Sequence, residues 1–258
     1  MFKSVLKEKS GYSILELTIA MMVGSILVSS AFQTHRYFMR SISRENEKAQ
    51  LQRDIAAIAN FLEKDIRMSG LGLPGNGFKL VLSTSASDEI QIFLNPEHLK
   101  TNLSADASTG ADRILVDDGG IIQDERWICI QSHDTTFREI LRVGIDVAGV
   151  DTFFLASNLD NTYPASNTTI YPARRIAYYV QNVPQKALYR KTNSTAVRLS
   201  ELLDTLNCVP KDKSGTPLSG SQIASARILS VIFGGKIGSG TNEVLIADST
   251  EVNIRNSL

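Results

Sequence analysis

The sequence predicts an α+β protein in which one long N-terminal helix precedes a β-rich head. Residues 12–32 form an almost wholly apolar run with Glu16 as its one acid, and no Gly or Pro interrupts residues 33–68. From residue 69 onward, short apolar segments alternate with clusters of Asn, Asp, Gly, Ser and Pro. That alternation is typical of antiparallel strands joined by turns.

The apolar run is long enough to cross a bilayer, which takes a helix of about 20 residues. An ionised carboxylate inside such a segment costs roughly 2.5–3.5 kcal/mol on insertion scales. Glu16 therefore needs a compensating partner. Ser13 and Glu16 also match a capping box, in which the glutamate would only complete the start of the helix. Both interpretations stay open at this point.

The apolar periodicity predicts that the helix continues beyond the membrane to residue 68. Within residues 33–68, apolar side chains recur at spacings of three and four, which places them on one helical face. The Gly-rich segment 69–77, with Pro74, then ends the helix, because Gly adopts the left-handed cap and Pro forbids continuation. The predicted buried stripe consists of Leu51, Ile55, Ile58, Leu62 and Ile66.

The remaining residues are enough for one hydrophobic core and predict a meandering antiparallel sheet. A short helix is expected at 199–206, a polar loop at 209–220 and a hairpin turn at 235–241. The predicted strands are 78–83, 89–94, 113–116, 126–131, 137–147, 152–156, 175–181, 188–191, 227–233 and 244–247.

A short leader, residues 1–11, precedes the apolar run and has an excess of lysine over acid. Lysines in such a flank favour a cytoplasmic N-terminus. A secretory signal peptide carries its small cleavage-site residue after the apolar core. Here the small residue, Gly11, comes before the core, which does not fit ordinary signal cleavage.

The segment 11–17, Gly-Tyr-Ser-Ile-Leu-Glu-Leu, resembles the start of type IV pilin precursors. The resemblance implies that a prepilin peptidase cuts after Gly11 at the cytoplasmic face and methylates the new N-terminus at Tyr12. It also implies a role in assembly for Glu16, which would pair with the free amine of a neighbouring subunit in the filament.

Several later stretches are similar to the PilW-like minor pilins. This resemblance implies a minor type IV pilin, a scarce filament subunit that helps initiate or cap pilus assembly. The similar stretches are 65–70, 175–180, 187–190, 200–203 and 252–256.

The resemblance further implies a location and a set of partners. The chain would cross the bacterial inner membrane once, with its head in the periplasm, and later lie in a pilus or pseudopilus at the cell surface. Its partners would be the prepilin peptidase, other pilin and minor pilin subunits, the inner-membrane assembly platform and, before assembly, membrane lipid. The expected organisation is a leader at 1–11, a helix at 12–68 with 12–32 in the membrane and 33–68 packed on the head, and a periplasmic or extracellular head at 69–258.

Two alternative functions remain open. A pseudopilin of the type II secretion system would share the same architecture. A signal-anchored periplasmic enzyme or receptor would share only the anchor. Processing by the prepilin peptidase would distinguish a minor pilin or a pseudopilin from a signal-anchored enzyme or receptor.

Arg36, Arg40 and Arg44 lie along one helical face just beyond the apolar run. They would either meet acids of neighbouring subunits in a filament or form a face that contacts solvent and lipid headgroups.

The two cysteines, Cys129 and Cys208, belong to the part of the chain that would face the oxidising periplasm. A disulfide between them is expected there, and the chain-entropy model gives a loop of this size roughly 4–5 kcal/mol of stabilisation. Two buried free thiols are the alternative. The spacing of these cysteines matches no zinc or redox motif.

No enzyme, cofactor or metal motif is recognisable in the sequence. The three histidines are isolated, and segment 235–241 lacks the lysine that a phosphate-binding loop places before its threonine. The pair Asp117 and Asp118 and the segment 158–161 are compatible with calcium loops, but polar turns of this composition are far commoner than such sites. The 27 basic and 27 acidic side chains balance, so nucleic acid is not indicated as a partner.

Overall fold

The structure is a computed structural model, and it divides into two units, one ending at Gln50 and one beginning at Leu51. The residues that the structure describes are 13–75, 77–82, 87–121, 127–134, 138–146, 151–181, 186–193, 195–219, 226–237 and 244–254.

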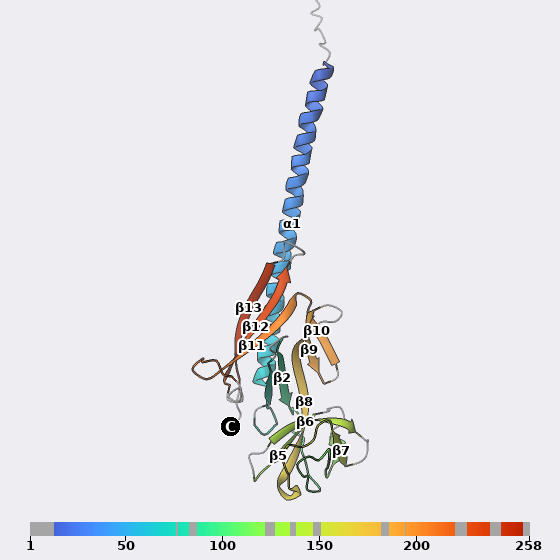
Figure 1. The fold of residues 1–258 in the computed structure, drawn as a ribbon, viewed down its shortest axis with the longest axis vertical. Coiled ribbons are helices and arrows are strands. Elements are labelled where there is room, and N and C mark those ends of the chain that lie inside the picture. Colours follow the sequence, from blue (N-terminus) through green and yellow to red (C-terminus); the bar gives the residue numbers. More distant parts are fainter. Residues whose placement is uncertain are drawn as a thin grey trace, which may run out of the picture. The chain divides into compact units, whose positions relative to one another are not determined.

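The first unit contains the N-terminal part of a single helix, α1 (Ile14–Arg67), which is 54 residues long and continues into the second unit (Figure 1). Its apolar side chains are exposed, with Ile14 at 83 % and Ile26 at 65 % of full exposure. An 18-residue window of this helix has a mean hydropathy of 1.9. By length and composition the helix is able to span a membrane.

In the second unit, referred to below as the head, α1 lies against the main hydrophobic core. Leu51, Ile55, Ile58, Leu62 and Ile66 are all buried, which confirms the predicted stripe. Burial of each such side chain contributes about 1.5–3 kcal/mol. No residue from 33 to 50 is buried, and the buried face of α1 begins at Leu51.

Helix α1 ends where the Gly-rich segment begins. Gly70 has a φ of 78°, a left-handed conformation that disfavours residues with a Cβ. The Gly70 amide donates to the carbonyl of Phe93 at 2.9 Å, so the chain is hydrogen-bonded to strand β2 (Glu89–Leu94) as soon as it leaves the helix. The predicted helix terminator is therefore confirmed.

The strands form two antiparallel sheets. The larger has ten strands in the order β1-β2-β8-β5-β6-β7-β4, with β3 and β9 also on β8 and β10 on β9, and the smaller has the order β11-β12-β13. The strands are β1 (Phe78–Val81), β2 (Glu89–Leu94), β3 (Thr101–Asn102), β4 (Arg113–Leu115), β5 (Trp127–Ser132), β6 (Arg138–Asp146), β7 (Thr152–Leu155), β8 (Thr168–Gln181), β9 (Ala187–Thr192), β10 (Thr195–Ser200), β11 (Leu203–Lys211), β12 (Ile228–Ile237) and β13 (Val244–Asn253), with short 3-10 turns η1 (Gly119–Ile121) and η2 (Ala165–Asn167).

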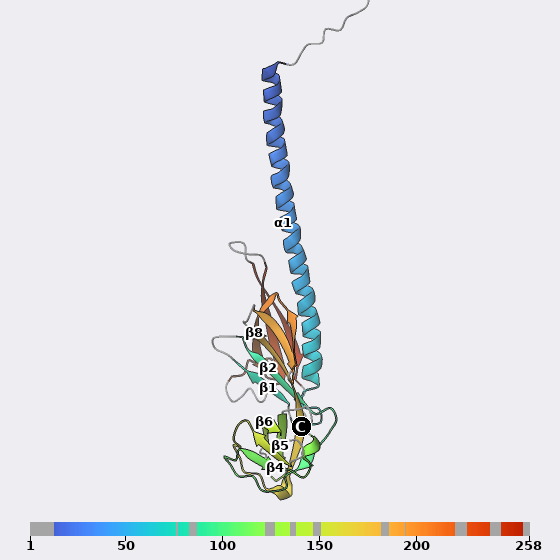
Figure 2. The ribbon, with the colours of Figure 1, turned by 90° about the vertical axis from the view of Figure 1, so that its right-hand side faces the viewer.

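The long strand β8 takes part in two hydrophobic clusters. Its second half pairs with β2 and β9, and Ile176 and Tyr178 enter the main core beside α1. Its first half pairs with β5, and Ile170 enters a second cluster with Ile128 and Phe153. Figures 1 and 2 show β5 and β6 at the end of the head opposite the β11–β13 sheet.

The helix predicted at 199–206 is wrong. Residues 199–200 end β10, and β11 begins at Leu203 and pairs with β12. Apolar residues at 199, 202, 203 and 206 have helical spacing, which explains the prediction. A β-bulge between Leu203 and Thr205 adds one residue, so Leu203 and Leu206 both point into the core. The predicted polar loop at 209–220 likewise begins inside β11.

The predicted fold class is confirmed. Each of the ten predicted strand segments overlaps a strand of the structure, and β3, β10 and β11 are additional. A long N-terminal apolar helix, followed by an antiparallel β head that packs on the last turns of that helix, is the pilin-like α+β architecture.

Candidate functional site

Glu16 lies in the first turn of α1 and is exposed. The Ser13 hydroxyl accepts a hydrogen bond from the amide of Leu15 at 3.4 Å, and the Ser13 carbonyl accepts one from Leu17 at 3.1 Å. Within the described residues, the Glu16 carboxylate has no hydrogen bond or ion pair, so the reciprocal half of a capping box is missing. Glu16 remains available to a partner outside its own helix.

The predicted cleavage and methylation residues, Gly11 and Tyr12, lie outside the described residues.

Residues 14–50 of α1 are called the stem. The exposed apolar surface of the stem restricts the environments in which it is stable. Large side chains such as Leu27, Phe32 and Ile42 are more than half exposed in this unit. Leaving each of them in water forgoes about 1.5–3 kcal/mol of burial energy. A surface of this kind is stable in lipid or in a bundle of other apolar helices.

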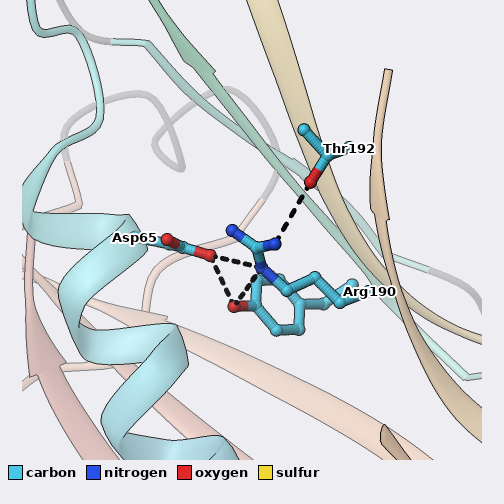
Figure 3. A network of polar contacts seen from close by, with 4 residues as sticks. Asp65, Arg190 and Thr192 are labelled. Carbon is cyan, nitrogen blue, oxygen red and sulfur yellow. Dashed lines mark hydrogen bonds and ion pairs between the residues drawn. The ribbon is translucent and has the colours of Figure 1, made fainter. Parts of the chain in front are cut away.

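A buried polar network joins the last turn of α1 to the sheet (Figure 3). Asp65 is 4 % exposed, and its Oδ2 accepts hydrogen bonds from the Tyr178 hydroxyl at 2.6 Å and from Arg190 Nε at 2.8 Å. Arg190 Nε also donates to the Tyr178 hydroxyl at 3.2 Å, and Arg190 Nη1 donates to Thr192 Oγ1 at 3.1 Å. The network therefore connects α1, β8 and β9.

The electrostatics of this network keep Tyr178 neutral and Arg190 charged. Burial, and then the hydrogen bond to Asp65, raise the pKa of Tyr178, so its hydroxyl stays neutral. Burial alone would lower the pKa of Arg190, but the hydrogen bond and charge of Asp65 outweigh it and the net shift is upward. The arrangement is a clamp between helix and sheet.

Sequence reasoning missed this clamp, although one signal was present. Asp65 lies in the last turn of a helix, where the macrodipole favours cations and disfavours acids. It also lies next to Ile66, which belongs to the buried stripe. An acid at that position is unfavourable unless the head supplies a cation.

A second buried carboxylate organises the other end of the head. Glu139 on β6 accepts hydrogen bonds from the amide of Asp160 at 3.0 Å, from the amide and side-chain Nδ2 of Asn161 at 2.8 and 2.9 Å, and from the Tyr163 hydroxyl at 3.0 Å. Burial and then the charge of Glu139 raise the pKa of Tyr163. Segment 158–161 is therefore a loop held by Glu139 through its amides.

Asp117 and Asp118 lie in a polar turn. Asp118 Oδ1 accepts from the amide of Gly120 at 2.9 Å, and its own amide donates to Thr101 Oγ1 at 3.0 Å. Across the part of the chain that the structure describes, no group of three or more His, Cys, Asp or Glu residues is arranged to hold a metal ion.

The predicted disulfide is not formed. Cys129 and Cys208 are both free and buried. Cys129 lies on β5 in a small cluster with Leu73 and Phe93, whereas Cys208 lies on β11 of the other sheet, in the main core. Burial raises the pKa of Cys129 to about 11 and also raises that of Cys208, so both thiols are neutral and unreactive.

No protein-family model, curated protein or solved structure matches this chain.

Proposed function

We propose that this protein is a minor type IV pilin of the PilW-like kind. In this proposal it is made as a precursor, cleaved after Gly11, methylated at Tyr12 and inserted in the bacterial inner membrane with its head in the periplasm. It then joins a filament as a scarce subunit that helps to initiate or cap assembly. The observation that carries the proposal is the exposed apolar stem, with Glu16 unpaired in its first turn, on the same helix that anchors an antiparallel head.

Glu16 has the position and surroundings that the assembly role requires. After cleavage at Gly11 it becomes the fifth residue, near the new amino terminus of the subunit. A carboxylate on an apolar helix is disfavoured in hydrocarbon unless a cation pairs with it. The methylated amine of a neighbouring subunit supplies that cation at the same depth.

The Asp65 clamp supports the PilW-like part of the proposal. Three of the stretches that resemble those minor pilins are 65–70, 175–180 and 187–190. Each contributes one member of the clamp, namely Asp65, Tyr178 and Arg190. Residues that are far apart in the sequence and similar to one family thus meet at one point, where they join the last turn of α1 to strands β8 and β9.

Processing is the direct test of this function. Gly11→Val places a branched side chain at the scissile bond, so the precursor should accumulate at full length. Gly24→Val is the matched control, because nothing lies within 4 Å of a Cβ built at Gly24, and it should be processed normally. Mass spectrometry of the wild-type protein should find methylated Tyr12 as its first residue. An intact N-terminus, or cleavage after the apolar run, would overturn the proposal.

A further inference from the structure

Three arginines form a row on the stem, at Arg36, Arg40 and Arg44, and this set is called the arginine row below. All three are exposed. Residues four apart on a helix advance by about 6 Å and about 40° around the axis, so the row is continuous and about 12 Å long. Phe38 and Ile42, at 57 % and 54 % exposure, lie on the roughly opposite side.

The arginine row begins one membrane thickness away from Glu16. Arg36 follows Glu16 by twenty residues, and no Asp, Glu, Lys or Arg lies between them. At 1.5 Å per residue this separation is about 30 Å, which equals the thickness of the hydrocarbon core. When Glu16 lies at one membrane surface, Arg36 lies at the other. Tyr37 then lies at the same level, where aromatic residues are enriched.

The charge of this row runs against the usual distribution of basic residues. Lys and Arg are concentrated on the cytoplasmic side of membrane helices. With a cytoplasmic N-terminus, as in the proposed function, the arginine row lies on the opposite side. In the described part of the chain, no ion pair involves any of the three. Three guanidinium groups at that depth call for an anionic partner outside the chain.

We propose that the arginine row binds the phosphates of anionic phospholipids in the leaflet from which the chain emerges after residue 32. This inference rests on the proposed function for its membrane orientation. Guanidinium groups bind phosphate through two parallel hydrogen bonds, and the planar fork suits a crowded headgroup layer. The headgroup layer is about 5–7 Å thick on each side. Arg36 therefore lies at its inner boundary and Arg40, about 6 Å further along the helix, lies near its outer edge. Arg44, about 12 Å along, lies about 5 Å beyond it.

Lipid selectivity of the reconstituted full-length protein tests the inference. The probes are spin-labelled phosphatidylglycerol and spin-labelled phosphatidylcholine, compared by electron spin resonance in phosphatidylcholine vesicles. The wild type should prefer phosphatidylglycerol, since each basic residue near an anionic surface shifts association by about fivefold. The double variant Arg36→Gln/Arg40→Gln should lose this preference, whereas Arg44→Gln should weaken it only slightly.

Two controls separate the row from general positive charge. Arg53→Gln removes an exposed arginine of α1 that lies outside the row, and it should leave the selectivity unchanged. Arg36→Lys/Arg40→Lys keeps the charge but loses the planar fork, so part of the preference should remain. The preference should also fall as salt is raised, because salt screens exposed charges.

The outcomes distinguish this inference from the proposed function. Resistance to alkaline carbonate extraction first establishes that each variant is inserted. A wild type that is extracted would overturn the membrane anchor and the arginine row together. An inserted wild type without lipid preference, or with a preference that the double variant retains, would overturn only the row. If that double variant also fails to enter filaments, acids of neighbouring subunits are the partners instead.

Discussion

At the scale of single residues, Asp65 and Glu63 show how burial determines what an acid contributes to stability. Its carboxylate is buried at the end of α1 and accepts from both Tyr178 and Arg190. The nearby ion pair between Glu63 and Arg67 is exposed on the same helix, with side chains 42 % and 67 % exposed. Exposed pairs of this kind contribute about 0–1 kcal/mol, whereas breaking a buried pair costs about 3–5 kcal/mol. Because Asp65 is buried and Glu63 is not, the ion pair of Asp65 contributes more to the stability of the head than that of Glu63.

This difference gives a prediction for paired variants. Asp65→Ala leaves the guanidinium of Arg190 without its counter-charge, and should lower the free energy of unfolding by about 2–4 kcal/mol, because Arg190 is itself partly exposed. Glu63→Ala should change it by less than about 1 kcal/mol. Urea unfolding of the full-length protein in detergent, followed by the fluorescence of the single tryptophan, Trp127, measures both. Equal stability of the two variants would show that the clamp contributes nothing beyond packing.

At the scale of elements, the approach of β12 to its neighbours depends on Gly235. A Cβ at Gly235 would lie 2.3 Å from the carbonyl oxygen of Leu202 and 3.2 Å from Leu51 Cδ1. The first contact is with backbone, which cannot rotate away. Gly235 thus permits the crowded junction at which β12, the start of β11 and the first buried residue of α1 meet.

We therefore predict opposite outcomes for two strand glycines. Gly235→Ala should lower the free energy of unfolding by about 1–3 kcal/mol, as overpacking does in cores. At Gly144 on β6 a Cβ would have its nearest neighbour at 3.7 Å, an ordinary contact. Gly144→Ala should be neutral or stabilise by up to about 1 kcal/mol, because it restricts the unfolded chain. The same urea titration compares them, and a neutral Gly235→Ala would show that β11 moves aside.

At the scale of the whole molecule, the size of the head bears on how abundant the protein is expected to be in a filament. The head exceeds the stem in chain length, extending from Leu51 to the C-terminus. If the proposed function is right, stems that pack side by side leave little room for a large head on every subunit. A scarce subunit at the start of the filament avoids that restriction.

Abundance and assembly therefore form the last prediction. Deletion of the gene should sharply reduce the number of filaments, while quantitative mass spectrometry of sheared filaments should find this protein far below the main subunit. Recovery at parity with the main subunit would make the protein a major pilin.

The variant Glu16→Leu tests the assembly role of Glu16. It should be processed and remain in the membrane, because it removes a charge from the apolar run, yet it should enter filaments poorly. Normal incorporation of the processed Glu16→Leu variant would return Glu16 to a role in starting the helix.

The sequence by itself determined the elements whose signals are local. The run without Gly or Pro, the stripe at spacings of three and four, and the Gly-rich terminator predicted α1 and its buried face. Alternating apolar residues between turn clusters predicted ten strands, because strand side chains alternate between two faces. These patterns repeat within a few residues, so they can be recognised in the sequence without knowledge of which distant residues are in contact.

Only the tertiary structure decided the features that depend on residues far apart in the chain. Leu203 and Leu206 have helical spacing but form part of β11, because a bulge and pairing with β12 override the local period. Cys129 and Cys208 enter different sheets, so no disulfide joins them. Asp65 is stabilised by Tyr178 and Arg190, more than a hundred residues away in the chain. Composition and spacing carry no information about which distant strand comes to lie beside a residue, and that neighbour determines its role.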